Sequence, residues 1–243
     1  MSSDNVHVGT SGWHYTHWKG PFYPQKMASK DFLSYYVQYF STSEINNSFY
    51  QLPAEKTLAG WRDAVPDGFQ FAVKGSRYIT HMKKLKEPEQ SVGNFLNRVE
   101  ALGDRLGPIL FQLPPKWKAN PERLESFLKA LPGDFDYVFE FRDTSWFAPE
   151  IEDLLSKHGA GFCIYDLAGT QSPQMVTGSL VYLRLHGPGG AYEGSYDDEA
   201  LSGWAEQIRN WSSEGRRVYC YFDNDEAGYA ARDGLRLLEM VKR

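Results

Sequence analysis

The chain has 243 residues, of which 42% are hydrophobic and 23% are charged, and its formal net charge is −5 at pH 7. These fractions are those of an ordinary globular protein and exclude a disordered or collagen-like chain. The negative charge argues against a nonspecific coat on nucleic acid, although it leaves room for a local basic site.

Eight short apolar segments rich in β-branched and aromatic residues recur along the chain, which is the pattern of strands. Most of them are followed by a segment with helical periodicity. The expected strands are Val6–Gly9, Thr42–Asn46, Phe69–Lys74, Pro108–Leu113, Tyr137–Asp143, Gly161–Asp166, Leu180–His186 and Arg217–Phe222.

Apolar side chains spaced three and four residues apart predict a helix after every strand except the sixth. Residues 167–179 are rich in Gly, Ser, Pro and Thr, and we expect a loop there in place of the sixth helix. No Gly-x-Gly-x-x-Gly turn follows the first strand, which disfavours a dinucleotide-binding open sheet. We therefore predict one α/β domain over residues 1–243, a single (β/α)₈ TIM barrel.

Both cysteines lie within expected strands. We expect Cys163 and Cys220 to be small buried side chains that face the surrounding helices. Their spacing predicts neither a disulfide framework nor a metal site. The polar N-terminus and the lack of an apolar run of about 18 residues predict a cytoplasmic protein with no signal peptide and no membrane span.

Polar and charged side chains gather at the carboxyl ends of the expected strands. Alternation along a strand places Glu140 and Arg142 on one face, and it places Arg184 and His186 together in the same way. In a TIM barrel the ligand site lies at this end of the strands. The side chains that we expect to face the barrel mouth are Thr10, Glu44, Asn46, Lys74, Gln112, Glu140, Arg142, Asp166, Arg184, His186 and Asp223.

Seven motifs, taken in order, are Gly9–Tyr15, Glu44–Tyr50, Lys74 with Ile79–His81, Leu106–Pro114, Glu140–Arg142 with Ser145–Trp146, Tyr182–Gly187, and Tyr221–Asn224 with Gly228 and Ala230. Together they resemble the YecE-like family, known as domain of unknown function 72, over nearly the whole chain. The resemblance implies a TIM barrel, a shape shared with endonuclease IV and sugar isomerases, and it implies no settled activity. Asp223 stands where members usually have asparagine, and Asp143 stands where they often have histidine.

An enzyme that binds an anion is the function that these residues favour. Arginine and lysine suit phosphate or carboxylate, and aromatic loop residues suit a base or sugar. Clustered charges push pKa values apart, so we expect Glu140, Asp166 and His186 to act as acids or bases. The expected partner is a phosphate- or nucleotide-bearing small molecule or a nucleic acid. Its expected contacts are Trp13, Tyr15, Glu44, Asn46, Lys74, His81, Gln112, Arg142, Trp146, Arg184, Asp223 and Asn224.

Three other interpretations stay open. The carboxylates and His186 suit a divalent metal, as in a metal-dependent sugar isomerase, and paired carboxylates with aromatic platforms suit a glycosidase. Because cationic side chains in the same ring compensate the carboxylates, and no His-x-x-x-His spacing occurs, we expect no cofactor. A non-catalytic binder of a nucleotide or nucleic acid would use the same groups. The charged groups are also compatible with a purely structural network of buried ion pairs.

Overall fold

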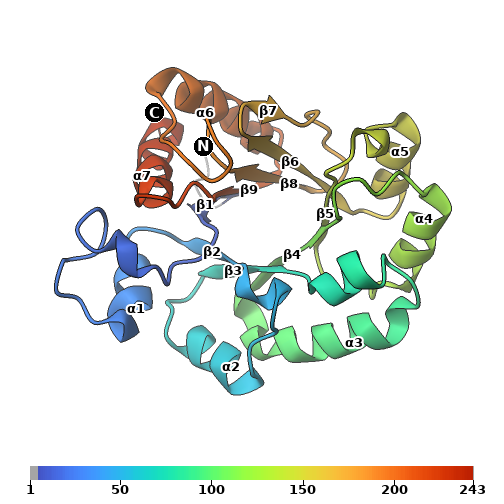
Figure 1. The fold of residues 1–243 in the computed structure, drawn as a ribbon, viewed down its shortest axis with the longest axis horizontal. Helices are drawn as coiled ribbons and strands as arrows, with labels where there is room; N and C mark the ends of the chain where they lie inside the picture. The colour runs from blue at the N-terminus through green and yellow to red at the C-terminus, as the bar shows by residue number, and fades with distance from the viewer. Residues whose placement is uncertain (1–4, 243) are drawn as a thin grey trace.

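The computed structural model describes residues 5–242, and at its centre lies a sheet of parallel strands surrounded by helices (Figure 1). The paired strands follow the order β1-β9-β8-β6-β5-β4-β3-β2, and the short β7 pairs only with β6. The first strand therefore lies beside the last, as in a TIM barrel. The strands are β1 Val6–Thr10, β2 Thr42–Ile45, β3 Gln70–Lys74, β4 Leu106–Gln112, β5 Tyr137–Glu140, β6 Gly161–Leu167, β7 Thr170–Gln171, β8 Leu180–Leu185 and β9 Arg217–Phe222.

The barrel closes between β1 and β2 through few contacts. One parallel bridge joins Ser11 to Glu44, and the Ser43 hydroxyl donates to the carbonyl oxygen of Thr10 at 3.1 Å. Gly9 lets the two backbones approach, because a Cβ atom there would lie 2.2 Å from the carbonyl oxygen of Thr42. The predicted barrel is confirmed as an almost closed ring of eight parallel strands.

Helices follow all the barrel strands but one, and they form the outer layer (Figure 1). The α4 helix begins as its sequence predicts, since Asn120 accepts a hydrogen bond from the N–H of Arg123 at 2.8 Å and Pro121 occupies the first turn. Within residues 5–242, no helix is long and apolar enough to cross a membrane. The α-helices are α1 Phe32–Tyr36, α2 Glu55–Asp63, α3 Pro88–Val99, α4 Pro121–Ala130, α5 Pro149–Lys157, α6 Asp198–Ser213 and α7 Tyr229–Val241.

Shorter helical turns occupy several loops, and the segment after β6 contains none. There β7 folds back antiparallel onto β6, and β6 then pairs directly with β8, from Cys163 beside Tyr182 to Asp166 beside Leu185. The predicted replacement of the sixth helix by a loop is confirmed. The short turns are η2 Thr16–Trp18, η3 Ser29–Asp31, η4 Asn47–Phe49, η5 Tyr78–Met82, η6 Glu100–Arg105 and η7 Thr144–Trp146.

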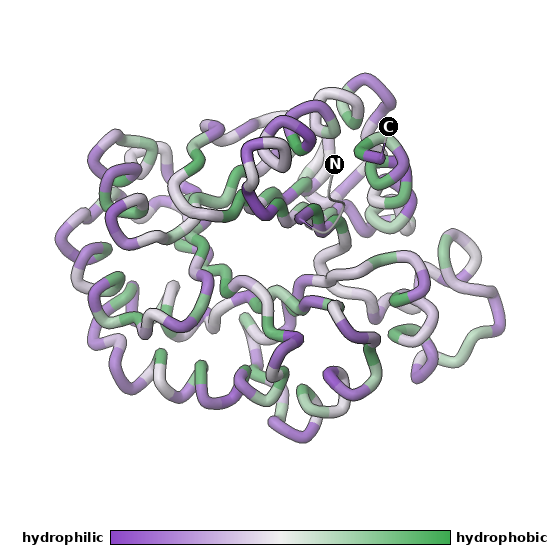
Figure 2. Tube along the Cα trace, turned by 180° about the vertical axis from the view of Figure 1, so that it is seen from behind, coloured by the Kyte–Doolittle hydropathy of each residue, from purple (hydrophilic) through white to green (hydrophobic). Residues whose placement is uncertain are grey.

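Alternation along the strands divides the hydrophobic core into two layers. The larger layer lies between the strands and the helices, and Figure 2 shows hydrophobic segments concentrated around the central ring. A smaller cluster fills the barrel interior, below the polar groups at the carboxyl ends. Its members are Ala72, Leu110, Val138, Cys163, Leu180, Tyr182, Tyr219 and Tyr221.

One of the two cysteines faces the side opposite to the expected one. Cys220 packs in the helix-facing layer, as predicted, whereas Cys163 lies in the barrel interior with its Sγ atom 3.9 Å from Oε2 of Glu140. The prediction for Cys163 was wrong because β6 is apolar on both faces, as buried parallel strands are, and carries no alternation that would reveal its orientation. The side chains of Ile164 and Asp166 therefore point away from the barrel interior.

Candidate functional site

Arg184 of β8 lies at the centre of a buried ion-pair network at the carboxyl ends of the strands. Its Nη1 atom donates to Oε2 of Glu140 at 2.9 Å. Its Nη2 atom donates to Oε1 of Glu44 at 2.8 Å and to Oδ2 of Asp223 at 3.0 Å. These carboxylates come from β5, from β2 and from the residue after β9. One arginine, which is 1% exposed, thus ties together three separate strands.

The buried carboxylates receive further hydrogen bonds. The Tyr182 hydroxyl donates to Oε2 of Glu44 at 2.7 Å, and the Ser11 hydroxyl donates to Oε1 of the same residue. Arg142 donates through Nε to Oε1 of Glu140. Burial alone would raise the pKa of Glu140, but Arg142 and Arg184 hold this pKa well below its usual value. Glu140 is therefore suited to be a fixed anion and not a proton donor.

His186 has a tautomer that its neighbours determine. Arg142 Nη2 lies 3.1 Å from Nε2 of His186, and Arg184 Nη1 lies 3.4 Å from the same atom. Guanidinium nitrogens only donate hydrogen bonds, so Nε2 is the acceptor and the ring proton is on Nδ1, which lies 3.0 Å from Oδ2 of Asp223. Burial and Arg184 lower the pKa of His186, so the ring is neutral at pH 7. Asp223 therefore lies against the Nδ1 side of His186, and the lone pair of Nε2 points to Arg142.

The loop after β8 covers His186. Its residue Tyr192 packs edge-on against the imidazole at 5.4 Å between ring centres, and the N–H of Tyr192 donates to the carbonyl oxygen of His186 at 2.6 Å. Gly187 permits this tight loop, because its φ of +112° favours glycine and a Cβ atom there would lie 2.3 Å from the carbonyl oxygen of Glu193. The Tyr192 side chain is exposed, so it forms a wall between His186 and solvent.

Lys74, at the end of β3, contacts an aromatic ring, whereas the two arginines contact carboxylates. Its Nζ atom lies 4.6 Å from the ring centre of Phe49, and the ion pairs of residues 5–242 give it no carboxylate partner. Burial and Arg184 lower the pKa of Lys74. His81 packs edge-on against Phe49 at 5.0 Å, and burial and Lys74 lower its pKa. This side of the mouth therefore carries positive charge that the protein itself does not pair.

The charged groups balance in number but not in position. Three cations and three carboxylates sum to zero when His186 is neutral. Glu44 and Glu140 are fully buried, whereas Lys74 and Arg142 are partly exposed at the mouth. We call the buried part, consisting of Arg184, Glu44, Glu140 and Asp223, the floor of the site. We call the partly exposed part, consisting of Lys74, Arg142 and Gln112, the rim.

Asp166, which was expected at the mouth, lies outside this network. It shares the outward face of β6 with Ile164, and its Oδ2 atom accepts a long hydrogen bond of 3.5 Å from Gln171 of β7. Burial raises the pKa of Asp166. Its expected position beside Glu140 and His186 was wrong, for the same reason as the position of Cys163: the orientation of β6 was assigned to the wrong face.

Two other predicted contact residues serve the packing of the fold. Trp146 is fully buried, stacks on Phe141 at 4.9 Å and donates from its indole to the carbonyl oxygen of Trp117 at 2.6 Å. The Asn224 amide donates to Oδ2 of Asp233 at 2.9 Å, which fixes the last loop to α7. Trp146 is therefore not available to stack on a substrate, and the expectation for it was wrong, whereas the amide nitrogen of Asn224 is used to hold the fold.

Ser11 and Tyr182 belong to the network although the sequence analysis did not select them. Tyr182 precedes Arg184 by two residues, so alternation along β8 was a usable signal. Ser11 lies just beyond the expected end of the first strand, and it takes the inward position that had been expected for Thr10. The Thr10 hydroxyl instead lies 2.9 Å from the hydroxyl of Tyr36 in α1, outside the barrel.

A pocket of about 450 Å³ opens beside the rim, between the segments that follow β1 and β2. Tyr15 forms part of the wall of this pocket, and its hydroxyl donates to the carbonyl oxygen of Ser11 at 2.6 Å. Trp13 is largely buried, 5.0 Å from Trp61 between ring centres. Thus Trp13 and Tyr15 lie next to the ion-pair network and not within it. The lining residues are Gly12, Trp13, His14, Tyr15, Ile45, Asn46, Asn47 and Trp61.

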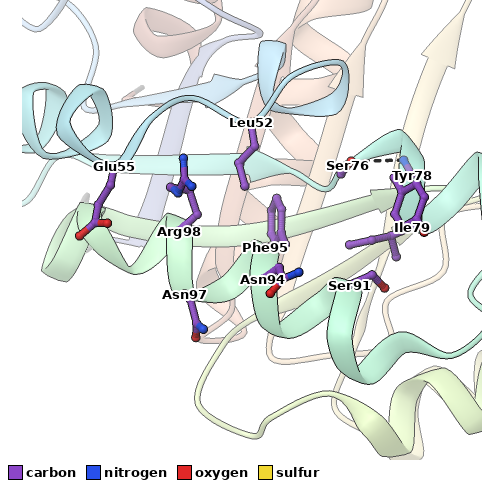
Figure 3. A pocket seen from close by; sticks show the side chains of 10 residues that line it. All are labelled: Leu52, Glu55, Ser76, Tyr78, Ile79, Ser91, Asn94, Phe95, Asn97 and Arg98. Carbon is purple, nitrogen blue, oxygen red and sulfur yellow. Dashed lines mark hydrogen bonds between the residues drawn. The ribbon is translucent and has the colours of Figure 1, made fainter.

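A larger hollow of about 550 Å³ lies outside the barrel, along α3 (Figure 3). Leu52, Tyr78 and Ile79 face Phe95 and Arg98 of the helix there. None of the residues that line this hollow was predicted as a site residue, and none belongs to the network.

The carboxylate oxygens of the network are not arranged to ligate a divalent metal. The oxygens of Glu44 and Glu140 already accept from arginine, serine or tyrosine, and Asp223 accepts from Arg184 and faces His186. Within residues 5–242, no group of three or more His, Cys, Asp or Glu side chains is placed to hold a metal ion. A metal would have to displace Arg184, whose burial makes that displacement costly.

Comparison with known proteins places the chain in a family. The family model described as "Protein of unknown function DUF72" matches residues 7–243. The UPF0759 protein YunF of Bacillus subtilis is 26% identical over 271 aligned positions, which cover 97% of this chain and 94% of that protein. The UPF0759 protein YecE of Escherichia coli is 32% identical over 130 positions, which cover 52% of this chain and 47% of that protein.

Solved structures of similar proteins support the same conclusion. A DUF72 family protein from Thermotoga maritima superposes with a TM-score of 0.89 at 29% identity, over 98% of this chain and 99% of the other. A DUF72 family protein from Enterococcus faecalis gives a TM-score of 0.82 at 19% identity, over 98% and 96% of the two chains, and shows the fold alone. The chain belongs to the DUF72 family of TIM-barrel proteins.

Proposed function

We propose that this protein is an enzyme that binds an anionic substrate at the rim and uses His186 as its base. The observation that carries the proposal is Lys74: its side chain is partly buried at the mouth, its pKa is lowered by burial and Arg184, and it has no carboxylate partner within residues 5–242. Removing a charge from water without a partner is unfavourable, and a bound phosphate or carboxylate would supply that partner.

Arg142 is the second anion-binding group. Among residues 5–242, only its Nε and Nη2 atoms have partners, which are Glu140 and His186, and the side chain is partly exposed. Its guanidinium also lies 4.8 Å from the ring centre of Tyr165, which holds the plane of the group. A planar guanidinium with free N–H groups suits a bidentate contact to phosphate or carboxylate.

Binding of the anion would make His186 available as a base. In the free protein, Nε2 of His186 accepts a hydrogen bond from Arg142, so this lone pair is occupied. If Arg142 turns its Nη2 atom to the substrate anion, Nε2 loses the shorter of its two guanidinium contacts and keeps only the 3.4 Å contact with Arg184, so it can take a proton from the substrate. Asp223 stays on Nδ1 and stabilises the imidazolium that forms, which is the role of an orienting carboxylate.

The alternatives are less well supported by the geometry. A glycosidase needs two accessible carboxyl groups, but Glu44 and Glu140 are fully buried beneath Arg184 and Arg142. A metal-dependent isomerase needs donors that are here committed to arginine. A non-catalytic binder of the same anion would use the same rim, and only turnover distinguishes it from an enzyme.

Calorimetric titration with phosphate and phosphorylated metabolites tests the binding part of the proposal. We expect Lys74→Met to weaken binding of each anion by about tenfold or more, because one charge-assisted contact is lost. Lys129→Met on α4, which removes an exposed lysine paired with Glu125, is the matched control and should bind as the native protein does. Unchanged affinity in Lys74→Met would refute the role of the rim.

Turnover of the bound metabolites tests the catalytic part. His186→Asn should bind the anion yet lose about 10²-fold or more in kcat, the usual contribution of a general base. Asp166→Asn is the matched control, because it changes a nearby buried carboxyl that faces away from the network. Full turnover by His186→Asn would exclude the base, and anion binding without turnover by the native protein would favour the binder.

A further inference from the structure

We infer that the aromatic pocket beside the rim binds a flat heteroaromatic ring, so that the anionic substrate is a nucleoside phosphate. This inference rests on the proposed function, since the phosphate would occupy the rim. The pocket volume of about 450 Å³ lies within the range of small-molecule sites. It lies between the first two strand-end loops of the barrel, on the face where TIM barrels hold their ligands.

The lining of the pocket suits an uncharged, flat group. It contains Trp13, Tyr15 and Trp61 and includes no Asp, Glu, Lys or Arg. The two indoles meet edge-on, with an interplanar angle of 85°, so together they offer a ring face and a ring edge. Aromatic surfaces of this kind favour stacking with a base and provide no partner for a charge.

Asn46 supplies a polar group at the inner end of this pocket. Its Oδ1 atom is buried and has no hydrogen-bond partner in the part of the chain that the structure describes, and its side chain makes no capping bond to the η4 turn that it precedes. A buried carbonyl oxygen without a donor is unfavourable, so it is a place where a ligand N–H is expected. The side-chain amide presents one acceptor edge and one donor edge, which matches the adjacent acceptor and donor of a nucleobase.

The pocket and the rim are close enough to be bridged by one small molecule. β2 pairs in parallel with β3, with Glu44 beside Ala72 and Ile45 beside Val73. The next residues along the two strands are Asn46 and Lys74, so their backbones continue at neighbouring positions, and paired strands lie about 4.8 Å apart. The segment that carries Asn46 is also tied to β3, because the Ser48 hydroxyl donates to the carbonyl oxygen of Lys74 at 2.6 Å.

Calorimetric titration with three ligands separates the two parts of the site. These three classes of ligand are inorganic phosphate, ribose 5-phosphate and the nucleoside 5′-monophosphates, which add first the sugar and then the ring. We expect at least one nucleotide to bind about tenfold or more tighter than ribose 5-phosphate, the effect of stacking one base. Asn46→Ala and Trp61→Leu should each remove most of this preference and leave the affinity for inorganic phosphate unchanged.

The control variants distinguish failure of this inference from failure of the proposed function. Lys74→Met should weaken all three ligands, whereas Trp211→Leu, on α6, should weaken none. If phosphate binds through Lys74 but no nucleotide binds tighter than ribose 5-phosphate, the ring pocket is wrong and the anion rim stands. A nucleotide preference that survives both Asn46→Ala and Trp61→Leu also overturns the inference. If phosphate does not bind at all, the proposed function fails with it.

Discussion

The floor and the rim of the site both contain cationic side chains, and they differ in the partners that these cations have. On the floor, Arg184 meets three carboxylates that the protein itself supplies, and every contact is shielded from solvent. At the rim, Lys74 has no carboxylate among the described residues, and Arg142 uses only part of its donors. Charge alone therefore does not separate the two regions; burial and pairing within the protein do.

The floor should be the part whose loss the fold cannot tolerate. Arg184→Met leaves three buried carboxylates without their shared cation, so we expect it to reduce the free energy of unfolding by about 3–5 kcal/mol. Urea denaturation at pH 7 measures this loss. Arg62→Met, which breaks an exposed pair with Asp63 and a 3.3 Å hydrogen bond to the carbonyl oxygen of Ala101, should have a far smaller effect. A loss below about 1 kcal/mol in Arg184→Met would show that the floor does not hold the barrel together.

Tyr182 tests the floor with a smaller change. Tyr182→Phe removes the hydroxyl that donates to Glu44 at 2.7 Å and leaves one buried carboxylate oxygen without that donor. We expect a loss of about 1–3 kcal/mol in the free energy of unfolding, again by urea denaturation. Tyr39→Phe, which alters an exposed tyrosine of the outer surface, is the control. Equal stability of the two variants would mean that Glu44 is satisfied without Tyr182.

The pH dependence of stability should report on His186, which lies between floor and rim. Burial and Arg184 lower the pKa of His186 from its ordinary value of 6.5. Below pH 6.5 the unfolded chain therefore protonates this histidine, whereas the folded protein keeps it neutral. Stability contributed by neutral His186 is therefore present above pH 6.5 and is lost as the pH falls below it. His7 and His81 have lowered pKa values and act in the same direction.

Thermal melts of the native protein and His186→Asn from pH 5 to 7.5 separate these histidines. We expect the native protein to lose stability towards pH 5 and the variant to lose less, since only His7 and His81 then remain. Identical pH profiles would mean that the pKa of His186 is the same in the folded and the unfolded protein, contrary to the lowered pKa expected from its burial beside Arg184.

The rim should tolerate substitution that the floor does not. Because burial and Arg184 lower the pKa of Lys74, the folded protein disfavours its charged form, and removing the charge should not destabilise it. We expect the melting temperature of Lys74→Met at pH 7 to equal or exceed that of the native protein. A drop as large as that of Tyr182→Phe would mean that Lys74 is a structural member of the floor.

Sequence patterns predicted the parts of the site where polar and apolar residues alternate. On β5 and β8, charged residues at every second position identified Glu140, Arg142, Arg184 and His186 as one inward group, and the structure brings them together. The barrel itself followed from the repeated strand–helix order. These inferences succeed because alternation is a direct consequence of strand geometry.

The remaining errors arose where the pattern carries no such alternation. β6 is apolar on both faces, so the orientation of Cys163 and Asp166 was not encoded in residue types. Trp146 looked like a stacking platform at a strand end, but tertiary packing on Phe141 buries it. Sequence patterns also could not predict the division into floor and rim. That division depends on which strands lie opposite one another and on which arginine and lysine side chains are already paired with carboxylates.

Nitrogen-15 NMR of the His186 ring, with and without phosphate, tests the central claim most directly. In the free protein we expect the proton on Nδ1 and a pKa below 6.5. Saturating phosphate should draw Arg142 away from Nε2 and place an anion nearby, so the pKa of His186 should rise. Lys74→Met should not show the change at the same phosphate concentration. A proton on Nε2, or a His186 signal that phosphate leaves unaltered, would contradict an anion-binding rim that controls this histidine.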